Sequence, residues 1–220
     1  MPRADLHIHT HHSYDSTTTP SSIVKRCLAK GIDCIAITDH NTIAGAEEVR
    51  QIAPFNVIIG EEIKSAGGDI IGLFLTEQVP SLLSPIETAE AIKAQGGLVM
   101  VPHPFDRLRS SALGKKHLEA ILPLVDIVES FNAHNLFNND NQCAAKFARD
   151  HNLVEAAVSD AHSHLEIGHT YVSIDNFDET TLGFKHTLAM GTLVGKKANP
   201  VLRFASTIAK IRSSRPPTKS

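Results

Sequence analysis

Cysteine is scarce in this sequence, and its few residues are scattered. The three cysteines, Cys27, Cys34 and Cys143, are an odd number and form no C-x-x-C pair. This pattern indicates neither a disulfide framework nor a thiolate zinc knuckle. It fits a reducing compartment, so we expect the protein to be cytoplasmic.

Long apolar segments and a surplus of positive charge are also missing. No stretch approaches the ~18 apolar residues of a membrane span, and the N-terminus enters a polar segment without an apolar signal core. We therefore expect a soluble protein with no membrane partner. Lys and Arg number 21 against 24 Asp and Glu, a formal net charge of −3. Because charge alone then cannot hold a nucleic-acid backbone, this balance argues against a long nucleic acid as partner.

Tryptophan is absent and tyrosine occurs twice, whereas histidine occurs 13 times. Histidine is the commonest metal ligand in proteins and titrates near neutral pH. The positions of the histidines along the chain therefore bear on whether this protein binds a metal ion.

The length of 220 residues, of which 42% are hydrophobic, suits one core. We expect residues 1–212 to form a single domain. Residues 213–220 show no apolar periodicity and are expected to be a disordered tail.

Short runs rich in Ile and Val alternate with amphipathic stretches of helical length. Such runs are typical of strands that are buried on both faces of a mostly parallel sheet. Two helices have clear ends: Thr19 and Pro20 begin one that Gly31 ends, and Ser84 begins another that ends at residues 96–97. Six to eight βα units result, which indicates an α/β barrel or a doubly wound sheet.

Most of these strands end in residues that can bind a metal ion. The carboxyl ends of barrel strands form one face, so residues remote in sequence converge there. A single histidine or aspartate at a strand end is more often a cap or a solvated group. Several strands that end in such residues on one face instead predict a metal centre. The candidate ligands are His7, His9, Asp15, Asp39, His40, Glu61, Glu62, His103, Glu129, Asp160 and His162.

The spacing of two pairs supports this prediction. His7 and His9 are two residues apart on a strand, so both imidazoles project from the same side. Asp160 and His162 repeat the spacing on a later strand. Mixed imidazole and carboxylate ligands suit Zn, Mn or Fe better than Ca or Mg.

These residues resemble the motifs of the PHP (polymerase and histidinol phosphatase) family of metal-dependent phosphoesterases. The similarity covers about residues 4–170, in the order of the chain. The matching segments are residues 5–10 (DLHIHT), 13–15 (SYD), 37–42 (ITDHNT), 60–63 (GEEI), 101–104 (VPHP) and 158–162 (VSDAH).

The resemblance implies a distorted (β/α)7, TIM-barrel-like fold that carries two or three divalent ions. The first ion would be held by His7, His9, Glu62 and Asp160, which would make these four the catalytic residues. Glu62 would bridge to a second ion, also held by His103. Asp15, His40 and His162 would hold a third ion.

The sequence departs from the family pattern at Asp69, where many members have a histidine ligand of the second ion. A carboxylate can replace imidazole on a divalent ion, so Asp69 can be a ligand or simply follow a tight turn at residues 67–68. Alternation along a strand lets only one of Glu61 and Glu62 face the site. The choice of Glu62 rests on the G-x-E pattern of the family.

The activity implied is hydrolysis of a small phosphomonoester, such as a nucleotide, a histidinol-phosphate-like compound or a sugar phosphate. A hydroxide that bridges two ions would be the nucleophile. Arg107, Lys64 and His134 are our candidates for binding the phosphorylated substrate, and Glu129 could orient a ligand histidine. A second subunit of a homo-oligomer could cover the open site. Two rival hypotheses are metal-dependent hydrolysis of a C–N bond, as in amidohydrolases, and a non-catalytic protein that binds or senses metal.

Overall fold

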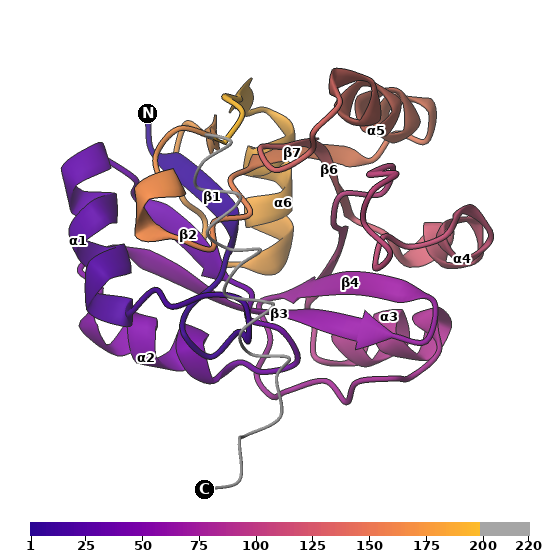
Figure 1. Ribbon diagram of the computed structural model, residues 1–220, viewed down its shortest axis with the longest axis horizontal. Helices are drawn as coiled ribbons and strands as arrows, with labels where there is room; N and C mark the ends of the chain where they lie inside the picture. Colours follow the sequence, from indigo (N-terminus) through magenta and orange to yellow (C-terminus); the bar gives the residue numbers. More distant parts are fainter. Residues whose placement is uncertain (199–220) are drawn as a thin grey trace, which may run out of the picture.

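The computed structural model describes residues 1–198, in which nine strands and six α-helices form an α/β fold (Figure 1). The expected tail at residues 213–220 and the end of the expected domain lie outside the described residues. The strands are β1 (Arg3–Ile8), β2 (Cys34–Ile37), β3 (Asn56–Ser65), β4 (Gly68–Leu73), β5 (Leu98–Val101), β6 (Ile127–Asn132), β7 (Val154–Val158), β8 (Tyr171–Ser173) and β9 (Thr192–Val194). They form one sheet in the order β7-β6-β5-β4-β3-β2-β1-β8-β9.

The sheet curls until β7 meets β1. A parallel bridge joins Ile8 to Ala161, which lies just beyond β7, and the His9 amide donates to the Ala161 carbonyl at 2.9 Å. The Asp5 carboxylate accepts a hydrogen bond from the Ser159 amide at 3.0 Å. The first seven strands therefore form a nearly closed barrel. This confirms the expected distorted, TIM-like α/β barrel.

The distortion of the barrel arises at β4. Strands β1, β2 and β3 pair in parallel, as do β5, β6 and β7, but β4 is antiparallel to both of its neighbours. A tight turn pairs Ser65 with Gly68, whose φ of 137° favours glycine. Because β4 runs backwards, its first residues lie at the carboxyl ends of the other strands. Asp69 reaches the same face as the other candidate ligands in this way.

The helices are α1 (Pro20–Lys30), α2 (Ala44–Ile52), α3 (Pro85–Ala94), α4 (Lys115–Ile121), α5 (Asn138–Asp150) and α6 (Thr181–Ala189). The two helices with clear sequence signals begin and end as expected. Ser84 and Glu87 form a capping box at the start of α3, and Thr19 caps α1. Gly31 ends α1 with a left-handed φ of 63°.

Alternate residues of the strands pack into two apolar clusters. In β2, Ile35 and Ile37 join the cluster that contains Ile23 of α1 and Val49 of α2. Ala36 joins the other cluster, which contains residues of α6. The strands are thus buried on both faces, as their apolar sequence predicts.

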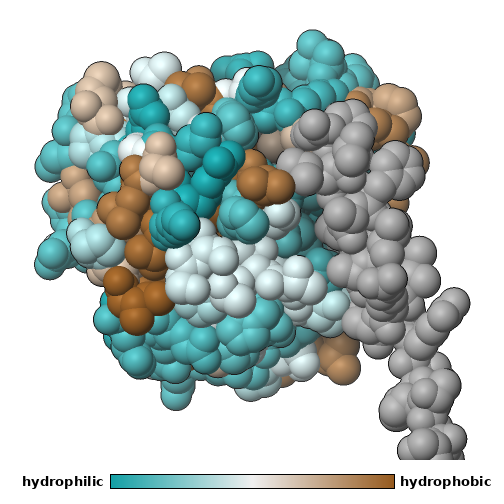
Figure 2. All heavy atoms as spheres, turned by 60° about the vertical axis from the view of Figure 1, so that its left-hand side comes forward, coloured by the Kyte–Doolittle hydropathy of each residue, from teal (hydrophilic) through white to brown (hydrophobic). Residues whose placement is uncertain are grey.

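The face of the molecule with α1 and α2 is mainly hydrophilic, with hydrophobic residues in small separate patches (Figure 2). Among residues 1–198, every helix is too short or too polar to span a bilayer.

Candidate metal centre

The expected ligands meet at the carboxyl ends of the barrel strands. His7 lies in β1, Glu62 in β3 and Asp69 at the start of β4, while the others lie in the loops that follow β1, β2, β5 and β7. All but His40 and His162 are buried. The residues gathered in this way are His7, His9, Asp15, His40, Glu62, Asp69, His103, Asp160 and His162.

Four of these side chains present ligand atoms to one another. The Nε2 atoms of His7 and His9 lie 3.0 Å apart. Glu62 Oε2 lies 3.5 Å from the His7 nitrogen and 3.4 Å from the His9 nitrogen. Asp160 Oδ1 lies 3.4 Å and 3.5 Å from the same two atoms. A tetrahedral ion with ligand bonds of about 2.1 Å needs ligand atoms about 3.4 Å apart. The five separations above, between the two nitrogens and from each nitrogen to the two oxygens, are close to that value.

A second group shares Glu62. Its other oxygen, Oε1, lies 3.1 Å from His103 Nε2, and Asp69 has a carboxylate oxygen within 4.8 Å of both residues. Asp69 therefore both follows the tight turn and faces the candidate metal centre. Glu61 points elsewhere and accepts a hydrogen bond from the Val79 amide at 2.8 Å. Glu62 is thus the member of the pair that can bridge two ions.

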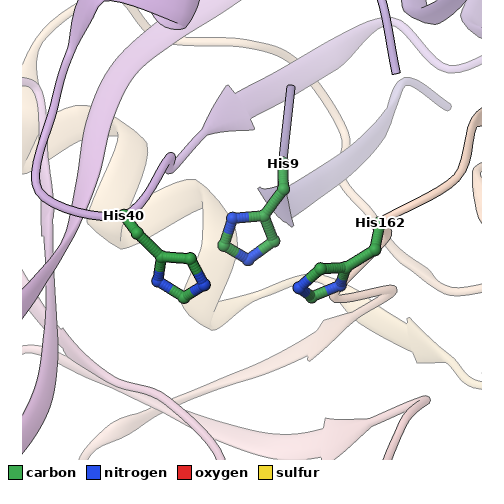
Figure 3. A group of neighbouring side chains, drawn as sticks. All are labelled: His9, His40 and His162. Atoms are coloured by element: carbon green, nitrogen blue, oxygen red, sulfur yellow. The ribbon is translucent and has the colours of Figure 1, made fainter. Parts of the chain in front are cut away.

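A third group consists of three imidazoles and one carboxylate. The rings of His9, His40 and His162 converge from the ends of β1, β2 and β7 (Figure 3). Asp15 Oδ2 lies 3.3 Å from the Nε2 atoms of both His40 and His162. Nitrogen and oxygen ligands of this kind suit the same class of cation.

Several buried atoms in these groups lack a hydrogen-bond partner. They are Asp15 Oδ1, Glu62 Oε2, His103 Nδ1 and Asp160 Oδ1. A buried carboxylate oxygen without a partner is costly, and it is rare in folded proteins unless an ion or water completes it. The residues therefore fit divalent cations, because bound ions would satisfy the carboxylate oxygens.

The electrostatics favour deprotonated ligands at two key positions. Burial lowers the pKa of His9, the nearby His162 adds to this effect, and the pKa falls to about 3. Burial raises the pKa of Glu62, but His40 and His7 outweigh burial and hold it well below its ordinary value. At neutral pH, His9 is therefore neutral and Glu62 is ionised, the states that a metal ion requires.

The pKa values of His7 and His40 are raised, in contrast to that of His9. Burial acts to lower both pKa values, but nearby carboxylates outweigh it. The charges of Asp160 and Glu129 raise the pKa of His7 well above its ordinary value. Glu62 and Asp15 raise the pKa of His40 to about 10. These two imidazoles carry protons that bound cations would displace.

Residues behind the ligands fix their orientation. Glu129 Oε1 lies 2.6 Å from His7 Nδ1, so a hydrogen bond there leaves Nε2 to face the other ligands. The second oxygen of Glu129 accepts from the His103 amide at 2.8 Å and from Asn132 Nδ2 at 2.8 Å. The geometry thus matches the orienting role expected for Glu129. Ser13, which sequence reasoning did not single out, lies 3.0 Å from His9 Nδ1 and donates to Asp39 at 2.6 Å.

Two of the ligand positions have a strained backbone. His103 has a φ of 31° and Asp160 a φ of 52°, in the left-handed region that residues other than glycine rarely adopt. Such a conformation costs about 1–3 kcal/mol per residue and concentrates at functional sites.

Within the described residues, Arg109 is the arginine that contacts a candidate ligand. Its guanidinium donates to Asp160 Oδ2 at 2.7 Å, and the side chain is 23% exposed. Arg107, which the sequence favoured, instead donates to Asp140 and lies over the ring of Phe137. The loop that follows β5 carries both arginines, and their positions in the sequence do not distinguish them.

The other two expected substrate contacts lie near the edge of the site. Lys64 is exposed, and the structure places no hydrogen bond or ion pair on its ammonium group within residues 1–198. His134 is buried, with Nε2 2.8 Å from Glu166 Oε1 and its ring centroid 5.5 Å from that of His162.

Comparison with known proteins agrees with this arrangement. The PHP domain matches residues 5–166 of the sequence. This chain belongs to the PHP family. An uncharacterized protein of Methanocaldococcus jannaschii is 41% identical over 150 residues, which cover 62% of this chain and 87% of that protein.

Solved structures show the same fold. A two-domain protein from Bacteroides vulgatus that contains a predicted PHP-like metal-dependent phosphoesterase has a TM-score of 0.69 at 20% identity. The match covers 86% of this chain and 62% of that chain, so this PHP chain spans less than two thirds of the length of that protein.

One neighbour corrects an expectation about partners. Endonuclease Q, solved with a 27-mer duplex that carries an abasic lesion at the active site, has a TM-score of 0.62 at 16% identity. The match covers 85% of this chain and 56% of that chain. The argument from net charge against a long nucleic acid is therefore wrong, because this fold accommodates a duplex. Net charge is summed over the whole chain and hides local differences. Residues 199–220 contain five Lys or Arg and no Asp or Glu. Bound metal ions also attract phosphate without surplus lysine or arginine.

Proposed function

We propose that this PHP protein hydrolyses a small phosphomonoester at the metal centre, with a nucleotide, a histidinol-phosphate-like compound or a sugar phosphate as substrate. The observation that carries the proposal is the group formed by His7, His9, Glu62 and Asp160, in which the two Nε2 atoms lie 3.0 Å apart and each lies 3.4–3.5 Å from one oxygen of Glu62 and one of Asp160. Nitrogen and oxygen ligands in this mixture favour Mn, Zn or Fe.

The residues of the chain hold and orient the reacting parts. When bound, divalent ions at this centre would supply Lewis acidity for the hydrolysis of a phosphoester. His7, His9, Glu62 and Asp160 would hold the first ion, and Glu129 fixes the imidazole of His7. Glu62 would bridge to the ion held by His103 and Asp69, and Asp15, His40 and His162 would hold the third.

Arg109 is the cation that we assign to the substrate phosphate. Its contact with Asp160 fixes the guanidinium beside the ligands, and its other N–H donors remain available for a phosphate oxygen. Lys64 and His134 would bind the substrate from the edge of the site. Arg107 is instead directed to Asp140, which accepts two of its N–H groups.

A second candidate is cleavage or trimming of a nucleic acid. It is favoured by the similarity to Endonuclease Q, which was solved with duplex DNA. Metal-dependent C–N hydrolysis and a non-catalytic metal-binding role would use the same ligands. The three reactions differ in the compound consumed and the non-catalytic role consumes none, so activity assays separate these four functions.

The test uses the full chain reconstituted with Mn, Zn or Fe. Phosphomonoesters, a 5′-phosphorylated oligonucleotide and a lactam are offered separately, and phosphate, shortened strands and ring-opened product are measured. We expect phosphate release from the monoesters. Turnover of the lactam alone would replace the proposal with C–N hydrolysis, and turnover of the oligonucleotide alone would replace it with nucleic-acid cleavage. Loss of metal binding with every preparation would contradict a metal centre altogether.

Neighbouring carboxylates on β3 supply a matched control. Glu62 faces the candidate ligands, whereas Glu61 accepts a hydrogen bond from Val79. Glu62→Gln should lose bound metal and turnover together. Glu61→Gln should keep both, because burial already raises the pKa of Glu61 to about 7 and a neutral amide has a similar shape.

A further inference from the structure

A separate group of metal-binding side chains lies at the surface, outside the centre described above. It consists of His11 and His12 in the loop between β1 and α1, and Glu48 in α2. One ligand atom from each residue lies within 4.8 Å of the other two. His12 Nε2 is 3.0 Å from Glu48 Oε1, and the rings of His11 and His12 have centroids 4.5 Å apart.

The loop holds both histidines in place through their backbones. The His11 amide donates to the Thr18 carbonyl at 2.9 Å, and the His12 amide donates to Thr10 Oγ1 at 3.1 Å. Thr10 is itself fixed, because its amide and hydroxyl donate to the two oxygens of Asp39 at 2.7 Å and 2.6 Å. The two imidazoles therefore project from a backbone that is already ordered.

Gly45 lets α2 pack closely against the loop that carries His11 and His12, and this places Glu48 beside them. A Cβ at Gly45 would lie 2.0 Å from Asp39 Oδ2 and 2.4 Å from Thr10 Oγ1, so only glycine allows α2 to approach the loop this closely. Glu48 is three residues further along α2 and lies on the same face of the helix. The close packing thus brings its carboxylate over His12.

The hydrogen bond between His12 and Glu48 explains why these two side chains meet, but it does not involve His11. Within the described chain, the ring of His11 makes no hydrogen bond, and it lies tilted at 40° to the ring of His12. Two imidazoles and one carboxylate on an exposed surface match an open zinc site, in which water takes the fourth position. Nitrogen ligands disfavour Ca and Mg.

We propose that His11, His12 and Glu48 form a peripheral site for Zn²⁺, distinct from the metal centre in the barrel. A bound ion would link α2 to the loop that carries Ser13 and Asp15. Because Ser13 lies beside His9 and Asp15 beside His40, the link would stiffen one wall of the centre without contacting substrate. The proposal does not depend on which reaction the centre performs.

The test measures zinc bound per chain. The metal-loaded protein is dialysed against zinc buffered at a series of free concentrations, and bound zinc is determined by elemental analysis. We expect His12→Ala and Glu48→Ala each to bind one equivalent less than the unchanged protein at saturation. His186→Ala, which removes an exposed imidazole from α6, is the matched control and should bind the full number.

Both variants change surface side chains, and a circular dichroism spectrum verifies that each is folded. Equal zinc stoichiometry in the unchanged protein, His12→Ala and Glu48→Ala would overturn the proposal. So would a loss of one equivalent in His186→Ala as well, because the loss would then not be specific to this group.

Discussion

Asp126 and two carboxylates of the candidate metal centre lie at opposite ends of the barrel and differ in how their oxygens are hydrogen-bonded. At the amino end, Asp126 precedes β6, and both of its oxygens have partners. Lys93 and the Val99 amide donate to one oxygen, and Lys185 donates to the other at 2.7 Å. At the carboxyl end, one oxygen each of Glu62 and Asp160 lacks a hydrogen-bond donor.

The difference separates a structural role from a functional one. Asp126 joins α3, α6 and β5, and each of its oxygens accepts a hydrogen bond, so both take part in holding these elements together. The carboxylates of the candidate metal centre keep an oxygen open where a cation would bind. In α/β barrels the carboxyl face usually carries function and the amino face stability. Substitutions at the carboxyl end should therefore affect metal binding and turnover, whereas a substitution of Asp126 should affect the free energy of unfolding.

The largest expected effect comes from removing a ligand. His9→Ala and Asp160→Ala should each release bound metal and lower turnover by about a thousandfold or more, since ion-assisted charge stabilisation contributes several kcal/mol. Elemental analysis and phosphate release measure the two effects. Retention of metal and activity in either variant would count against the assignment.

Asp126→Ala should instead lower the stability of the fold and leave the metal centre intact. It leaves the Val99 amide and two lysines without their acceptor, so we expect a loss of about 2–4 kcal/mol in the free energy of unfolding. Metal content and turnover per folded molecule should be unchanged. Urea unfolding measures the first quantity. A fall in metal content at full folding would show that the two ends of the barrel are coupled.

Sequence reasoning recovered most of the barrel and its candidate ligands for local reasons. Helix caps at Thr19 and Ser84 involve neighbouring residues, so their signals are visible in the chain itself. Ligands that follow short apolar strands share a face because of barrel topology. Both kinds of inference depend on patterns a few residues long.

The features that sequence reasoning missed depend on contacts between distant segments. The reversal of β4 follows from pairing with β3 and β5, although the two glycines at residues 67–68 marked the turn. Arg109 and Arg107 lie two residues apart, and only the folded loop shows that Arg109 reaches Asp160. One miss does not depend on such contacts: the net charge of the whole chain concealed a basic final segment, residues 199–220.

Glu129→Gln tests how strongly a residue behind the ligands affects the centre. The amide keeps the shape but weakens the hydrogen bond that orients His7, so metal affinity or turnover should fall by about 10–100-fold. Competition with a chelator measures affinity, and unfolding by urea serves as the control. An unchanged affinity and rate would mean that His7 is held by its packing alone.

The smallest effect is the pH dependence of Asp126. Burial raises its pKa, but Lys185 and Lys93 outweigh burial and hold it below the ordinary value. The folded state therefore binds fewer protons at this carboxyl than the unfolded state, in which the pKa is about 3.9. Its contribution is complete above that pH and is lost as pH falls through the lower pKa of the folded state.

The stability difference between the unchanged protein and Asp126→Asn should accordingly shrink as the pH falls below about 4. Because Lys93 and Lys185 are about one-third exposed, solvent screens the pair, and the change should be on the order of 1 kcal/mol. Urea unfolding of metal-free protein at a series of pH values measures it. The groups of the metal centre titrate in both proteins and cancel in the difference. A difference that stays constant down to pH 3 would show that the charge of Asp126 does not contribute to stability.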